Sequence, residues 1–316
     1  TVETLNLDGR GGNDTVKLTG TAGDETVELQ ARGGTMSGEG YTVNVASAES
    51  IEVAGGGGND VVTMFDSDGD DTFVGYWAGA DMYLPTGTHQ VRDVDFIYAK
   101  ATGAGHDKAR FYDSTGDDTF ATVPAYGKMH FSDGLTTQAE SFDEVHAFAT
   151  NGGHDITKMY DSPGDDTYYA TPLETALFGD GFYNRAKFFE EVHAYATAGG
   201  DDLAKLYDSA GDDRFIAKAN YGKLWGGDFF NRAVSFRYVH AYAVAGGVDR
   251  AKLYDSTGDD RLKASGNKAS LSGDDLMACV HDFSWVRAIS SQGGDDTRRL
   301  KSVDYLLRTT GIWRDV

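Results

Sequence analysis

The sequence predicts an all-β fold, a β-solenoid of the parallel β-helix type, with about seven repeats of about 47 residues and a C-terminal cap. Three observations predict it. A repeat fills the chain, apolar and polar residues alternate with a period of two, and glycine- and aspartate-rich turns interrupt this alternation about every ten residues. A unit of four or five short strands cannot bury its apolar face alone, whereas stacked units share a continuous core.

The repeat is marked by two acidic phrases that recur every 46 to 48 residues. The first ends a glycine-rich turn at Asp14, Asp60, Asp107, Asp155, Asp202, Asp249 and Asp296. The second, as in "YDSAGDD", begins at Asp66, Asp113, Asp161, Asp208 and Asp255. Together they predict a solenoid over residues 1–296 that starts in mid-repeat and leaves no room for a separate catalytic domain.

Within a unit, the strands show the alternation of a half-buried sheet. In "DDLAKLYDS", Ala204 and Leu206 face one way while Lys205 and Tyr207 face the other. We expect successive units to stack like on like, so that Asp113, Asp161, Asp208 and Asp255 form one column. The two halves of a unit show little likeness, which favours one wide turn of the solenoid per repeat over two ordinary turns.

Both ends of the array carry an expectation. Residues 297–316 place Leu300, Val303, Leu306 and Leu307 at helical spacing, which predicts a partly helical cap over the open strand edges. The first strand follows no cap of its own. We therefore expect end-to-end stacking on upstream repeats or on another copy of the chain.

The charge balance excludes several partners. The 316 residues contain 28 Lys and Arg against 50 Asp and Glu, a net charge of −22, which repels nucleic acid and anionic lipid. No window of 18 apolar residues predicts membrane insertion. Cys279, the single cysteine, cannot form an intramolecular disulfide and has the neighbours of a core position.

Two resemblances bear on location and ligands. The phrases "AYATAGGDDLAKLYDSAGDDRF" and "GFYNRAKFFEEVHAYATAGG" resemble the tandem repeats of very large bacterial secreted or surface proteins, which implies an extracellular or cell-surface location. Locally, "GRGGND" at Gly9–Asp14 and "GGGGND" at Gly55–Asp60 resemble the calcium-binding nonapeptides of repeats-in-toxin proteins. The ten-residue spacing from Asp60 to Asp70 departs from that pattern.

The acidic turns are candidate sites for structural Ca²⁺. Carboxylate and carbonyl oxygens suit this cation, and stacked aspartates repel one another unless they are neutralised. The alternatives are solvated turn charges and, for the first aspartate of "YDSxGDD", an inward carboxylate that accepts turn N–H bonds. The candidate metal ligands are Asp14, Asp24, Asp60, Asp70, Asp71, Asp117, Asp118, Asp165, Asp166, Asp212, Asp213, Asp259 and Asp260.

The function that the sequence predicts is an extracellular structural or adhesive module, a subunit of a filament or surface layer. The alternatives are a β-helical carbohydrate-active enzyme of the polysaccharide lyase type and a non-catalytic sugar-binding module. His146, His193 and His240, continued by Arg287, recur at one phase of the repeat, which favours packing, so no catalytic residue is assigned. The tyrosines that precede the acidic phrases, Tyr112, Tyr160, Tyr207 and Tyr254, have two possible interpretations, stacking on sugar rings or packing between repeats.

Overall fold

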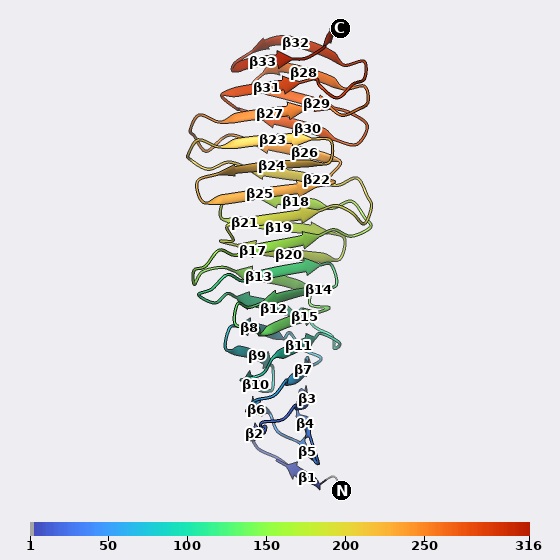
Figure 1. The fold of residues 1–316 in the computed structure, drawn as a ribbon. Helices are drawn as coiled ribbons and strands as arrows, with labels where there is room; N and C mark the ends of the chain where they lie inside the picture. The colour runs from blue at the N-terminus through green and yellow to red at the C-terminus, as the bar shows by residue number, and fades with distance from the viewer. Residues whose placement is uncertain (1–2) are drawn as a thin grey trace. The chain divides into compact units, whose positions relative to one another are not determined.

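The computed structural model describes residues 3–316, and every regular element within them is a β-strand. The chain divides into two compact units, residues 1–155 and 156–316. In each unit the strands stack in two sheets, which we call sheet A and sheet B, as a parallel β-solenoid (Figure 1). Because this part of the chain contains no helix, none of it forms a helix that could cross a membrane.

Residues 3–155 of the first unit form sixteen strands. Those of sheet A are β1 (Glu3–Asp8), β3 (Thr26–Gln30), β4 (Gly33–Gly38), β5 (Tyr41–Ala46), β7 (Val61–Phe65), β11 (Phe96–Lys100), β13 (Thr119–Val123), β14 (Tyr126–His130) and β15 (Thr136–Glu140). Those of sheet B are β2 (Thr15–Thr19), β6 (Ser50–Ala54), β8 (Thr72–Tyr76), β9 (Gly79–Leu84), β10 (Gly87–Arg92), β12 (Lys108–Tyr112) and β16 (Glu144–Phe148).

The second unit continues the same alternation. Its sheet A strands are β17 (Ile156–Tyr160), β21 (Glu191–Tyr195), β23 (Arg214–Lys218), β24 (Tyr221–Gly226), β25 (Phe229–Val234), β27 (Arg250–Tyr254), β31 (Trp285–Ile289) and β33 (Leu306–Thr310). Its sheet B strands are β18 (Thr167–Ala170), β19 (Glu174–Gly179), β20 (Phe182–Lys187), β22 (Leu203–Tyr207), β26 (Tyr238–Tyr242), β28 (Arg261–Gly266), β29 (Lys268–Ser272), β30 (Met277–His281), β32 (Thr297–Val303) and β34 (Arg314–Asp315).

Each repeat covers one and a half turns of the solenoid, because three of its five strands form an antiparallel meander within one sheet. In one repeat, β22 lies in sheet B, β23–β25 form the meander in sheet A, and β26 returns to sheet B. The next repeat starts with β27 in sheet A and places its meander, β28–β30, in sheet B. Neither one wide turn nor two turns per repeat is therefore correct.

Equivalent residues of successive repeats consequently lie on opposite sheets, and the expected like-on-like columns do not form. Asp208 follows β22 in sheet B whereas Asp255 follows β27 in sheet A. Instead, a strand stacks on a different strand of the same repeat, one turn of the solenoid later in the chain. The Tyr207 ring lies parallel to that of Tyr242, with centroids 4.8 Å apart and an interplanar angle of 12°.

The core lies between the two sheets and follows the period of two. In β12, Ala109 and Phe111 are fully buried, while Lys108, Arg110 and Tyr112 face outward. The Phe111 ring packs 5.8 Å from that of Phe73 and 5.4 Å from that of Phe120. Each buried phenylalanine contributes about 2–3 kcal/mol of transfer free energy, so the stacking of repeats supplies the core that a single repeat lacks.

The C-terminal segment forms the strands β32, β33 and β34 instead of a partly helical cap, so the helical expectation is wrong. β32 pairs in parallel with β28, and β33 pairs in parallel with β31. The open edges of β28 and β31 offer rows of unpaired N–H and C=O groups, and an added strand satisfies them while a helix would not. Strand pairing at these open edges therefore overrides the helical preference predicted from the spacing of Leu300, Val303, Leu306 and Leu307.

Candidate metal centres in the acidic turns

Each repeat brings two wide turns to the same sheet edge. The first, which we call the acidic turn, has the sequence Asp-Ser-x-Gly-Asp-Asp, and the second, the glycine turn, ends in the aspartate of Gly-Gly-x-Asp. In the second unit, both β22–β23 and β26–β27 cross from sheet B to sheet A. The acidic turn Asp208–Asp213 and the glycine turn that ends at Asp249 are therefore neighbours in the stack.

The first aspartate of the acidic turn points inward and caps the glycine turn. Asp208 accepts N–H bonds from Val244 and Ala245 at 3.0 Å, and Asp66 accepts those of Thr102 at 2.8 Å and Gly103 at 2.9 Å. Asp113, Asp161 and Asp255 accept equivalent bonds from Asn151, Ala198 and Ser291. The predicted inward, N–H-accepting role is confirmed, although the donors belong to the next turn of the solenoid.

The last aspartate of each turn completes this set of caps. Asp71 accepts the N–H of Ser67 at 2.8 Å and its hydroxyl at 2.9 Å. The N–H of Asp71 in turn donates to Oδ1 of Asp107 at 2.8 Å, and the N–H of Asp107 donates to Asp143 at 2.7 Å. The turn amides thus find carboxylate acceptors, and bonds to ionised acceptors are stronger than neutral ones.

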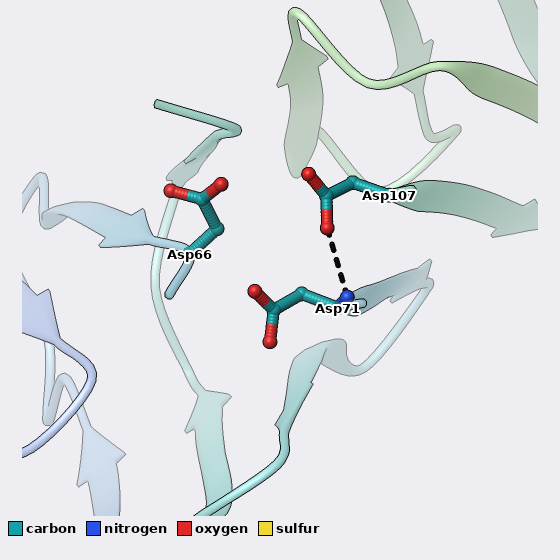
Figure 2. A group of neighbouring side chains, drawn as sticks. All are labelled: Asp66, Asp71 and Asp107. Atoms are coloured by element: carbon teal, nitrogen blue, oxygen red, sulfur yellow. Dashed lines mark hydrogen bonds between the residues drawn. The ribbon is translucent and has the colours of Figure 1, made fainter. Parts of the chain in front are cut away.

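Three sets of these aspartates form compact, buried clusters. Their carboxylate oxygens lie within 4.8 Å of one another, one from each residue, and we call them the three-acid clusters. Figure 2 shows the first, in which Asp66 and Asp71, at the two ends of one acidic turn, and Asp107, at the end of the next glycine turn, surround a common space. The three sets are Asp66, Asp71 and Asp107; Asp161, Asp166 and Asp202; and Asp208, Asp213 and Asp249.

Burial makes these negative charges costly. It raises the pKa of Asp71 and Asp107 above the usual range, and it raises the pKa of Asp202 to about 6, with the charges of Asp161 and Asp166 adding to the effect. Two charges 4.8 Å apart repel by roughly 3.5 kcal/mol at an effective dielectric near 20. A shared proton or a cation removes that repulsion.

The structure separates the two members of each predicted Gly-Asp-Asp pair. The first aspartate of each pair is exposed. In one such pair, the carboxylate of Asp70 accepts the N–H of His106 at 2.9 Å. The second is buried, because adjacent strand residues face opposite ways. The exposed set is Asp24, Asp70, Asp117, Asp165, Asp212 and Asp259, while Asp60, Asp71, Asp118, Asp166, Asp213 and Asp260 are buried and Asp14 is half-buried.

Six residues of the three-acid clusters are absent from the ligand set predicted from the sequence. They are Asp66, Asp107, Asp161, Asp202, Asp208 and Asp249. The signal was present, because both acidic phrases keep the same period, but nothing in the sequence indicated that the two phrases face one another across the stack. Only Asp71, Asp166 and Asp213 belong to both the predicted set and the clusters.

The first repeat departs from this pattern. Gly20 and Glu25 occupy the positions of Asp66 and Asp71, so only two acids, Glu25 and Asp60, stand where each later cluster has three. Glu25 accepts the N–H and hydroxyl of Thr21, and its own N–H donates to Asp60 at 2.8 Å. Burial raises the pKa of Asp60, as it does in the three-acid clusters.

The histidines do not form one row. His146 and His240 lie in sheet B whereas His193 and Arg287 lie in sheet A. His193 contacts Glu191 at 2.7 Å, and burial lowers the pKa of His240 to about 4. These separate environments leave the repeated histidines without a shared constellation.

No protein-family model matches this chain, and no curated protein is significantly similar to it.

Proposed function

We propose that this chain is an extracellular structural or adhesive module, a rigid β-solenoid whose three-acid clusters bind Ca²⁺. The observation that carries the proposal is the burial of three carboxylates within 4.8 Å, repeated three times along the fold. No Lys, Arg or His in residues 3–316 forms an ion pair with these nine aspartates. A cation would supply the missing countercharge.

Calcium is the cation that the donor set favours. Every candidate ligand in a three-acid cluster is a carboxylate oxygen. Hard oxygen donors in a flexible arrangement suit Ca²⁺ better than transition metals, and extracellular modules bind it at the concentrations found outside cells. Bound ions would tie the acidic turn to the glycine turn and stiffen the stack.

Self-association belongs to the same proposal. Strand β1 pairs with β5 on one side, and its residues are largely exposed, with Leu5 54% accessible. An exposed edge strand is a template for another strand, so end-to-end stacking of copies would extend the module. A chain with Leu5→Lys should then sediment as a smaller species than the unsubstituted chain.

The calcium test compares thermal unfolding in CaCl₂ and in EGTA, together with Tb³⁺ luminescence as a direct probe of the sites. The test variant is the triple Asp107→Asn, Asp202→Asn and Asp249→Asn, which removes one carboxylate from each cluster but keeps the Oδ1 acceptor. The matched control replaces three exposed hairpin acids, Glu39→Gln, Asp180→Asn and Asp228→Asn.

We expect CaCl₂ to raise the Tm of the unsubstituted chain and of the control, and to leave the Tm of the cluster variant nearly unchanged, because a ligand that binds only the folded state stabilises it. Equal Tm values in CaCl₂ and EGTA, with no Tb³⁺ signal, would refute calcium binding and leave a shared proton as the neutralising charge.

A further inference from the structure

The outer face of sheet A in the second unit carries a row of positive side chains. Seven strand pairings place one outward residue of each strand in register across eight neighbouring strands. Six of the eight are Lys or Arg. In spatial order this cationic row is Lys158, His193, Arg232, Lys223, Ile216, Lys252, Arg287 and Arg308.

The positive charges of the row face one another without carboxylate partners. Arg232 lies directly opposite Lys223, and Arg287 lies opposite both Lys252 and Arg308. None of the six Lys and Arg side chains forms an ion pair within residues 3–316, although acids outnumber bases 50 to 28 in the chain. Like charges opposite each other destabilise a sheet, so an anion bound on the row would relieve this repulsion.

Aromatic rings hold these cations flat against the sheet. The Lys223 Nζ atom lies 4.7 Å from the centroid of the Trp225 ring, and the Arg232 guanidinium lies 4.9 Å from that of Tyr221. Such contacts orient a cation without neutralising it. The Nε atoms of Arg232 and Arg287 are buried and have no hydrogen-bond partner within residues 3–316, so no acceptor from the described chain compensates these two donors.

A groove of about 660 Å³ runs beside the row. Its lining includes Trp225, Arg214, Arg250, Trp285 and Leu306, which stand opposite one another on consecutive strands. The two tryptophans flank the two arginines across three strand spacings, roughly 14 Å. Aromatic faces pack against sugar rings, while the guanidinium fork matches a carboxylate.

The corresponding row of the first unit shows that the cations are not a general property of this fold. At the same position of sheet A, in spatial order, it contains Asn44, Thr35, Glu28, Thr63, Tyr98, Gln138, Lys128 and Ala121. This row of the first unit contains one Lys and one Glu, whereas the cationic row of the second unit contains six Lys and Arg residues. Glu191, an acid on the outward face of β21 beside the row, contacts His193 at 2.7 Å.

We propose that this face binds a linear polysaccharide that carries carboxylate groups, with Trp225 and Trp285 against its rings and Arg214, Arg250 and the cationic row on its acids. The pair of guanidinium groups between two indoles along the groove favours this polymer over nucleic acid. The inference deepens the adhesive part of the proposed function and rests on it, but it is independent of Ca²⁺ at the sheet edges.

The experiment measures binding of the full chain to polygalacturonate by calorimetry in EGTA, so that no Ca²⁺ can bridge the two polyanions. Neutral dextran, dextran sulfate and oligothymidylate are the comparison ligands. The row variant is Lys252→Gln, Arg287→Gln and Arg308→Gln, and the groove variant is Trp225→Ala with Trp285→Ala. The matched control, Lys100→Gln, Arg110→Gln and Lys128→Gln, removes the same charge from the outward faces of the first unit.

We expect polygalacturonate to bind the unsubstituted chain and the control equally, and to bind the row and groove variants at least about tenfold more weakly, because each loses several charge-assisted or stacking contacts. Dextran should not bind. The proposal is overturned if polygalacturonate does not bind, if the control loses as much affinity, if dextran sulfate or oligothymidylate binds more tightly, or if the row variant only abolishes self-association. The Ca²⁺-dependent Tm of the same variants reports separately on the calcium proposal.

Discussion

The carboxylate of Asp208 accepts the backbone N–H of Ala245, 37 residues later in the chain, at 3.0 Å. The same bond recurs between Asp161 and Ala198 at 2.9 Å. It connects an acidic turn to the glycine turn above it, and it explains why one chain repeats the same acidic phrase. The glycine turn cannot supply acceptors for its own amides, so the preceding turn of the solenoid provides them.

Loss of this cap should be costly. We expect Asp208→Ala to lower the free energy of unfolding by about 2–4 kcal/mol, because it leaves the N–H groups of Val244 and Ala245 without their acceptor. The control Asp228→Ala removes the same charge from an exposed hairpin and should change it by less than about 0.5 kcal/mol. Urea denaturation measures both, and equal effects would contradict the capping role.

The finding that each repeat covers one and a half turns of the solenoid can be tested with a double-mutant cycle. Tyr207 and Tyr242 stack at 4.8 Å, so replacing both by Ala should reveal a coupling energy of about 1 kcal/mol. Tyr207 and Tyr254 occupy the same position of successive repeats but lie on opposite sheets. Their cycle should give a coupling near zero. A larger coupling for Tyr207 with Tyr254 than with Tyr242 would mean that like residues stack on like.

The buried acids predict an unusual pH dependence. The pKa of Asp202 is raised to about 6 in the folded chain. The stabilisation of the folded state by protonated Asp202 is therefore fully present below its ordinary pKa of 3.8 and is lost as pH rises through about 6. In metal-free buffer, the Tm should therefore fall between pH about 4 and about 7. Asp202→Asn should flatten this slope, whereas Asp201→Asn, at an exposed neighbour, should not. Calorimetry across that range gives the answer, and a Tm that rises with pH would contradict the sign.

Close packing of the meander can be probed at a glycine. A Cβ atom on Gly222 would lie 2.6 Å from Cγ1 of Val239, so Gly222→Ala should destabilise the fold by about 1–3 kcal/mol. Val239→Ala in the same chain should recover part of that loss by making room. At Gly211 a Cβ atom would meet nothing closer than 3.5 Å, so Gly211→Ala is the control. Identical stabilities for both glycine variants, measured in urea, would refute the steric argument.

Much of the fold could be predicted from the sequence alone. The period of two placed Ala204 and Leu206 inside and Lys205 and Tyr207 outside, as the structure has them. The solenoid, its strands, its acidic turns and the inward position of Asp113, Asp161, Asp208 and Asp255 likewise follow from local patterns. Alternation, turn chemistry and repetition are properties of neighbouring residues, so the order of letters is enough to determine them.

Only the tertiary structure decided which repeated letters meet. The meander makes each repeat one and a half turns long, and this sends Asp208 and Asp255 to opposite sheets while it brings Asp208 beside Asp249. The same pairing decides that Lys252, Arg287 and Arg308 form an unbroken positive row. Which strands become neighbours depends on how far the chain travels around the core between them, and that path is a property of the whole stack.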